Sequence, residues 1–182
     1  MEKYRFLLSG SGGQGIITMA ILLAEAAAIY DNLTAVQSQV YGPEARGGAT
    51  RSDVIISDSP ILFPKVTQPG ILVALNQSSF MKYGNLIRPG GLLLTDSHLV
   101  YAARDLDVRH IALPLHETVL RELGGAQSLN ICTLGALVAL TRAVRPESVE
   151  KVLARRFPAA VESNLKALRL GLALGEGARD RL

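Results

Sequence analysis

Glycines close to the amino terminus form the most chemically suggestive pattern in the sequence. Residues 10–18 read GSGGQGIIT, in which Gly10, Gly12 and Gly15 satisfy the spacing Gly-x-Gly-x-x-Gly directly after the apolar run 4–9. Glycines at this spacing permit a tight turn and a close approach of a phosphate group to the backbone, and the free N–H groups of a following helix favour an anion. The segment therefore predicts either an anion-binding loop or a structural turn.

The residues that follow argue against two common nucleotide sites. A nicotinamide or flavin dinucleotide site adds a carboxylate about 20 residues further on, but residues 36–39 read VQSQ. A nucleoside triphosphatase loop needs Gly-Lys-Ser or Gly-Lys-Thr, whereas Gly15 is followed by Ile16 and Ile17. An independent NAD(P)-binding oxidoreductase is kept only as an alternative hypothesis.

A second glycine-rich loop follows the second expected strand. Residues 41–48 read YGPEARGG and place Arg46, a forked cation, beside Gly47 and Gly48. Loops at the carboxyl ends of nearby strands in an open sheet lie close together. The two loops can hold one phosphate-bearing ligand or form a rigid surface for a partner chain, and the residues alone leave both alternatives open. An ion pair of Arg46 with Glu44, or a subunit contact, is the structural alternative for this arginine.

Composition indicates one globular domain spanning residues 1–182. Hydrophobic residues make up 48% of the 182 and charged residues 19%, which provides ample apolar material for a core. The net charge is +3, and the basic excess begins at Arg142, which suggests either solvated helix faces or docking to an acidic partner. Few aromatic residues disfavour a nucleic-acid partner, and no membrane span or leader is expected, so a cytoplasmic location is predicted.

Cysteine and histidine usage assigns no catalytic residue and no metal site to this chain. Cys132 is the single cysteine, and an iron–sulfur cluster normally needs about four thiolates. His98, His110 and His116 lack the helical i, i+4 spacing of zinc enzymes. Any cluster therefore belongs to a partner.

The apolar pattern predicts a strand–helix alternation followed by a helical carboxyl-terminal part. The first two strands are expected to be a parallel pair, Asn130 an N-cap, and Gly175 with Gly177 the end of the last helix. The predicted fold is a three-layer α/β/α arrangement with a Rossmann-like, mostly parallel or mixed sheet. The expected strands are 4–9, 33–38, 52–57, 71–76, 92–96 and 108–114, and the expected helices are 14–30, one ending near 87, 115–123, 130–142, 146–157 and 159–174.

Three segments together resemble a known family. Residues 10–27, 37–61 and 130–140 carry a Gly-Gly-Gln-Gly loop, a Gly-Pro-Glu-x-Arg-Gly-Gly loop and a late Asn-x-x-x-Leu-Gly helix, in that order. This arrangement resembles the gamma subunit of the 2-oxoacid:ferredoxin oxidoreductases, which belong with the pyruvate/ketoisovalerate oxidoreductases. The 2-oxoglutarate type fits best, with the indolepyruvate and branched-chain 2-oxoacid types as alternatives.

The resemblance implies a non-autonomous enzyme subunit. Alpha and beta partner subunits would bind thiamine diphosphate with Mg²⁺ and decarboxylate the 2-oxoacid, and [4Fe-4S] clusters in beta or in a ferredoxin-like delta subunit would pass electrons to ferredoxin. Coenzyme A would take the acyl group, giving acyl-CoA and CO₂. The gamma subunit would pack on the catalytic subunits and help to form the coenzyme A site. A purely structural subunit with no ligand contact is the alternative, and a homodimer is possible for the isolated chain.

The same resemblance implies the site residues. Some family members have a lysine in or near the first loop, and this sequence has none there. Arg46 or a cation from a partner would then supply the positive charge. The implied ligand-binding residues are Gly10, Gly12, Gly13, Gln14 and Gly15 in the first loop and Arg46, Gly47 and Gly48 in the second.

Overall fold

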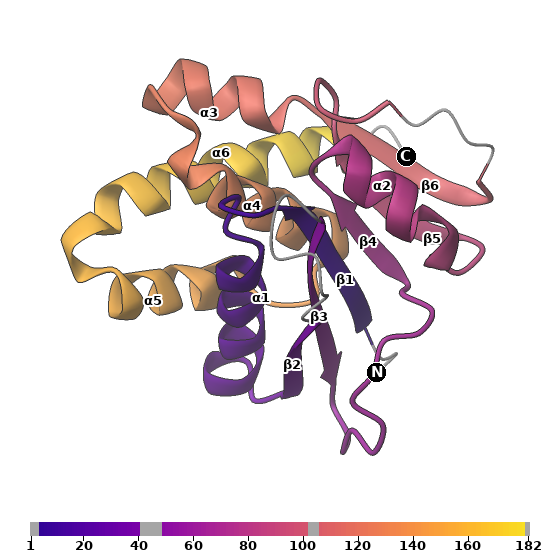
Figure 1. The fold of residues 1–182 in the computed structure, drawn as a ribbon. Helices are drawn as coiled ribbons and strands as arrows, with labels where there is room; N and C mark the ends of the chain where they lie inside the picture. Colours follow the sequence, from indigo (N-terminus) through magenta and orange to yellow (C-terminus); the bar gives the residue numbers. More distant parts are fainter. Residues whose placement is uncertain (1–3, 41–48, 102–105, 181–182) are drawn as a thin grey trace.

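A six-stranded mixed sheet forms the centre of the molecule (Figure 1). The computed structural model describes residues 4–40, 49–101 and 106–180. The strands are ordered β2-β3-β1-β4-β5-β6 across the sheet. Their bounds are β1 Tyr4–Ser11, β2 Thr34–Val40, β3 Ala49–Ser57, β4 Ile71–Ala74, β5 Gly91–Asp96 and β6 Val108–Leu113.

The direction of β3 separates this sheet from a simple parallel one. Strands β1, β4, β5 and β6 pair in parallel, whereas β3 is antiparallel to both of its neighbours, β1 and β2. The expectation that the first two strands form a pair is therefore wrong. β1 and β2 run in the same direction, but β3 inserts between them, because the chain returns from β2 into an antiparallel neighbour before reaching β4.

Helices cover both faces of the sheet, which confirms the three-layer α/β/α fold. Alternate strand residues point to opposite faces of the sheet. Phe6 and Leu8 belong to the larger hydrophobic core on one face, and Leu7 belongs with Phe80 to a smaller cluster on the other. Figure 1 shows α2 on one side of the sheet and the other long helices on the opposite side. The helices are α1 Ile16–Glu25, α2 Gln77–Tyr83, α3 Leu115–Leu123, α4 Leu129–Thr141, α5 Pro146–Arg156 and α6 Val161–Arg179, with short turns η1 Ala26–Tyr30, η2 Gly84–Leu86, η3 Ala126–Ser128 and η4 Pro158–Ala160.

Helix α6 continues through the glycines that were expected to end it. It reaches Arg179, beyond Gly175 and Gly177. A Cβ on Gly171 would fall within 1.8 Å of the Cys132 carbonyl oxygen, and one on Gly175 within 2.6 Å of the Ala136 carbonyl oxygen. These glycines permit close contact between the backbones of α6 and α4, so tertiary packing outweighs the low helix propensity of glycine.

The connection between β3 and β4 crosses the amino end of β1. In the sheet order β1 lies between these two strands, so residues 58–70 must pass around its first residues. The Gly70 amide accordingly donates to the Arg5 carbonyl oxygen at 3.0 Å. The amino end of β1 thus carries this connection, and its carboxyl end carries the glycine loop (Figure 1).

Candidate functional site

A crevice at the carboxyl ends of β1 and β4 is the expected ligand position in this topology. The helix that follows β1, α1, covers one face of the sheet, and the helix that follows β4, α2, covers the other. In open α/β sheets ligands bind where successive connections diverge in this way. A hollow of about 380 Å³ opens at the carboxyl end of β1, on the side of β3, and is lined by Ser11, Gly12, Gly13, Gly15, Ile16, Ile17, Thr18 and Thr50.

The Gln14 side chain stabilises the glycine loop through hydrogen bonds to backbone atoms. Its Oε1 accepts the Ser11 amide at 2.7 Å, and its Nε2 donates to the Leu75 carbonyl oxygen at 3.5 Å. The Gln14 amide in turn donates to the Ser11 carbonyl oxygen at 3.2 Å. A Cβ on Gly10 would come within 2.5 Å of Gln14 Oε1, so glycine leaves room for this brace. The Gln14 side chain thus ties the end of β1 to the end of β4.

Gly12 and Gly13 form the open rim of the loop. Both are exposed, and a Cβ on either would meet no atom of the described residues within 4 Å. Gly13 has a φ of +88°, which favours glycine. A side chain at position 12 would therefore not clash within the described chain. A glycine there leaves the backbone uncovered, which suits a ligand or partner that approaches it closely.

The amino terminus of α1 points a positive helix end at the hollow. Gly15 caps the helix with a φ of +71°, and the first intrahelical bond joins the Met19 amide to the Gly15 carbonyl oxygen at 2.9 Å. The amides of the preceding first turn have no intrahelical acceptor. The described first turn contains no acidic residue that would neutralise this end. Such a terminus favours an anion.

Asn130 reaches the glycine loop from the start of α4. Its Nδ2 donates to the Gly15 carbonyl oxygen at 3.3 Å, and its Oδ1 accepts the Ile131 amide at 2.9 Å. The expectation that Asn130 is an N-cap is wrong, because Ser128 holds that position. Sequence reasoning missed this positioning residue, since the late Asn-x-x-x-Leu-Gly pattern carries no information about a partner 115 positions earlier.

The second glycine loop lies outside the described residues, and with it Arg46, Gly47 and Gly48. Ala49 and Thr50, which follow it, pair with Ser11 and Gly10 of β1. Among the described residues, those that line the hollow include no lysine or arginine.

Other titratable groups among the described residues have structural roles. Burial, together with the nearby Asp96 carboxylate, raises the pKa of the Cys132 thiol to about 12, so this cysteine stays protonated. The Asp96 carboxylate accepts the amides of His98, Leu99 and His116 at 2.7–3.0 Å and shapes the chain after β5. Burial lowers the pKa of His110, whose Nε2 lies 2.9 Å from Thr95 Oγ1.

The described residues contain neither a metal-binding cluster nor a membrane-spanning helix. Within residues 4–40, 49–101 and 106–180, no three His, Cys, Asp or Glu side chains gather in a way that could hold a metal ion. Over the same part of the chain, no helix combines the length and apolarity that a membrane crossing needs.

Comparison with known proteins identifies relatives over nearly the whole chain. Residues 5–174 match the family model described as pyruvate ferredoxin/flavodoxin oxidoreductase. The 2-oxoglutarate synthase subunit KorC of Methanocaldococcus jannaschii is 47% identical over 167 residues, which are 90% of this chain and 89% of that protein.

Solved structures show the same fold. The gamma subunit of a keto/oxoacid ferredoxin oxidoreductase from Geobacter sulfurreducens is 42% identical and superposes with a TM-score of 0.90, covering 98% of this chain and 99% of that one. The 2-oxoglutarate:ferredoxin oxidoreductase from Magnetococcus marinus, determined with 2-oxoglutarate, coenzyme A and succinyl-CoA bound, is 22% identical with a TM-score of 0.88. The match covers 97% of this chain and 32% of that one. At that identity the second likeness concerns the fold alone.

Proposed function

The chain belongs to the pyruvate ferredoxin/flavodoxin oxidoreductase family and is a gamma-type subunit most similar to those of the 2-oxoglutarate type. We propose that it is the gamma subunit of a thiamine-diphosphate-dependent 2-oxoglutarate:ferredoxin oxidoreductase and that its glycine loop helps to bind coenzyme A. The whole chain, residues 1–182, is proposed to act as one domain of that complex in the cytoplasm.

Chemistry at the oxoacid is assigned to partner subunits. The single cysteine, buried and with a raised pKa, does not fit an iron–sulfur cluster, which needs about four thiolates. The described residues likewise offer no clustered carboxylates for the Mg²⁺ of thiamine diphosphate. Alpha and beta subunits would therefore hold thiamine diphosphate with Mg²⁺. [4Fe-4S] clusters in beta or in a delta subunit would carry the electron pair from decarboxylation to ferredoxin.

The glycine loop is the observation that supports a coenzyme A contact. Coenzyme A carries phosphate groups, and the exposed backbone of Gly12 and Gly13 lies beside the unneutralised amino end of α1. Amides of this loop and of the first helical turn would donate to phosphate oxygens, while Gln14 and Asn130 hold the loop in place.

Arg46 would add charge to the same site. It precedes Ala49, the first residue of β3, by three positions in the sequence. Gly47 and Gly48 would let the second loop approach the ligand. The described residues that line the hollow include no lysine or arginine, so a partner subunit would supply any further positive charge at the coenzyme A phosphates.

A purely structural subunit is the competing function, and the kinetics of one variant distinguish the two. Arg46→Ala in the assembled complex should raise the KM for coenzyme A while leaving the KM for the oxoacid unchanged. Arg169→Ala, on an exposed face of α6, is the matched control and should change neither constant. A loss of assembly with an unchanged KM for coenzyme A would favour the structural role.

The assignment as a whole is tested by purification and assay. The tagged chain, purified anaerobically from its source, should co-elute with thiamine-dependent and iron–sulfur subunits and support ferredoxin reduction that requires both 2-oxoglutarate and coenzyme A. Replacing 2-oxoglutarate by indolepyruvate or a branched-chain oxoacid identifies the substrate. Recovery of the chain alone, with thermal stabilisation by millimolar NAD(P), would contradict the assignment.

A further inference from the structure

The connection between β3 and β4 presents two adjacent apolar side chains to solvent. Leu62 is 92% exposed and Phe63 is 63% exposed, and Leu62 is the most exposed large hydrophobic side chain in the described residues. Single exposed hydrophobic residues are common on protein surfaces. Two that are neighbours at the tip of one loop are typical of an interface instead. We call the segment 58–70 the prong.

The prong is anchored at its base and stiffened near its tip. Arg51 Nη2 donates to the Val66 carbonyl oxygen at 2.7 Å, and the Val66 side chain is buried. Pro60 and Pro64 flank the exposed pair, and each proline fixes one backbone φ angle. A tip that is already ordered loses little conformational entropy when a partner binds it.

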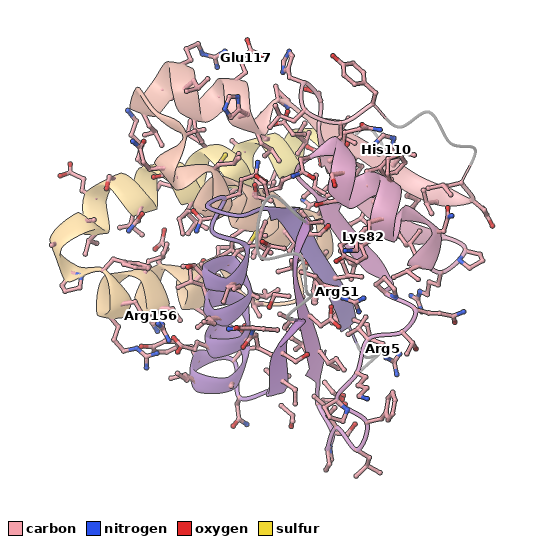
Figure 2. The ribbon with its side chains drawn as sticks, viewed as in Figure 1. Arg5, Arg51, Lys82, His110, Glu117 and Arg156 are labelled. Carbon is pink, nitrogen blue, oxygen red and sulfur yellow. The ribbon has the colours of Figure 1, made fainter. Side chains whose placement is uncertain are left out.

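A cation-lined hollow begins where the prong rejoins the sheet. Its volume is about 300 Å³, and its lining includes Arg5, Arg88 and Arg109 but no acidic side chain among the described residues. The three arginines come from β1, the turn before β5, and β6. Gly70 also lines this hollow and donates its amide to the Arg5 carbonyl oxygen. Figure 2 shows the Arg5 side chain just above the prong.

The positive charge of the arginine-lined hollow favours an acidic partner over a second copy of this chain. Two copies of this chain that met symmetrically through this surface would bring the arginine-lined hollows of the two copies together, and like charges at an interface oppose binding. An acidic protein surface would instead be complementary to Arg5 and Arg109. The apolar tip of Leu62 and Phe63 would fill a cleft in that surface.

We propose that the prong and the arginine-lined hollow form the surface through which this chain binds an acidic face of a catalytic partner subunit, with Leu62 and Phe63 inserted into an apolar cleft. This inference rests on the proposed function, because it takes the partner to be a subunit of the oxidoreductase. The surface lies at the amino end of β1, opposite the glycine loop, so docking there would leave the loop open to coenzyme A and to a second partner subunit.

The test is assembly of the complex from co-expressed subunits. Leu62→Ser with Phe63→Ser should reduce the fraction of the tagged chain recovered in the complex at least tenfold. Arg5→Glu with Arg109→Glu should reduce it at least threefold, with a larger loss at low salt because screening weakens surface electrostatics. Leu120→Ser on α3 and Arg169→Glu on α6 are matched controls and should assemble like the unaltered chain.

The outcomes separate this inference from the proposed function. Thermal unfolding of each free variant must match that of the unaltered chain, and the two variant pairs change different residues, so misfolding of one leaves the other as a test. Normal assembly of both pairs would overturn the docking surface while leaving the proposed function intact. Failure of the unaltered chain to enter the complex would overturn both. A free dimer that the serine pair dissociates would assign the surface to a second copy.

Discussion

The two ends of the parallel strands differ in what they present to a partner. At the carboxyl end of β1 the surface is mostly backbone. Gly12 and Gly13 are exposed, and the side chain of Gln14 forms hydrogen bonds within the chain. At the amino end side chains point outward, with Leu62 and Phe63 on the prong. Backbone amides suit a small anionic ligand, whereas exposed apolar and cationic side chains suit a protein surface.

Gly15→Ala adds one methyl group and should have the largest effect on stability of the changes considered at the carboxyl end of β1. Gly15→Ala forces a left-handed conformation, which costs roughly 1–2 kcal/mol in a non-glycine residue, and its Cβ would lie 2.4 Å from Asn130 Nδ2. We expect the free energy of unfolding to fall by about 2–4 kcal/mol, measured by denaturant titration. Adding Asn130→Ala should recover the part due to the clash. An unchanged midpoint would show that the loop does not depend on this geometry.

Asn130→Ala by itself should have a smaller effect on the fold. It removes the bond to the Gly15 carbonyl oxygen, and losing one partner of such a bond costs about 1–2 kcal/mol. Because the freed loop would be less ordered, the KM for coenzyme A in the assembled complex should also rise. Steady-state kinetics at saturating 2-oxoglutarate measure it. A stability loss with unchanged kinetics would restrict Asn130 to packing.

Gly12→Ala sharpens the comparison because it separates binding from folding. Its Cβ meets no described atom, so the unfolding free energy should change by less than about 0.5 kcal/mol. The KM for coenzyme A should nevertheless rise at least fivefold if a phosphate approaches this backbone. Gly177→Ala, another glycine with open space but on α6, is the control. Equal kinetics for the two variants would argue against a ligand at the rim.

Glu25, at the carboxyl end of α1, should contribute to stability in a pH-dependent way and should not affect ligand binding. Hydrogen bonds from Arg156 and then Arg155 hold the pKa of Glu25 below its usual 4.5, although burial opposes them. Figure 2 shows Arg156 beside α1. This contribution is present above the unfolded pKa and disappears as the pH falls through the folded pKa. Glu25→Gln should remove that part of the acid dependence and cost less than about 1 kcal/mol near pH 7.

A change in the coenzyme A kinetics of Glu25→Gln would contradict the separation between the two ends of α1. Chemical denaturation between pH 3 and 7 measures the first expectation, and steady-state kinetics the second. Arg121, which pairs with Glu122 on α3, offers a matched control in Arg121→Gln, since that pair lies on another helix.

Short-range patterns in the sequence predict the elements and the glycine loop. The apolar run before Gly10 gives β1, and the glycine spacing places a turn where the structure has one. The order of strands depends on long-range pairing, so the insertion of β3 between β1 and β2 escaped this reasoning. Glycine is typical of helix ends, so the local pattern predicts an end at Gly175. The contact of Gly175 with Ala136 on α4 is tertiary, and the local pattern does not reveal it.

The candidate site residues also divide into those that local sequence patterns identify and those that depend on long-range contacts. Local spacing identifies Gly12, Gly13 and Gly15, whereas the bond between Asn130 and Gly15 joins distant parts of the chain. The prong contains Pro60, Pro64 and Pro69, and this composition by itself indicates only an irregular connection. Composition does not reveal that Leu62 and Phe63 are exposed while Val66, in the same segment, is buried. Whether the predicted ligand residues bind coenzyme A stays a prediction.

Hydrogen exchange of backbone amides tests the division between the two ends most directly. The free chain, the assembled complex and the complex with coenzyme A would be compared. Assembly should protect the amides of residues 61–63. Coenzyme A should then protect those amides of residues 12–18 that have no acceptor within the chain, which exchange rapidly in its absence. Protection of residues 12–18 by assembly alone, with no further change on adding coenzyme A, would contradict the account and make the glycine loop part of a subunit interface.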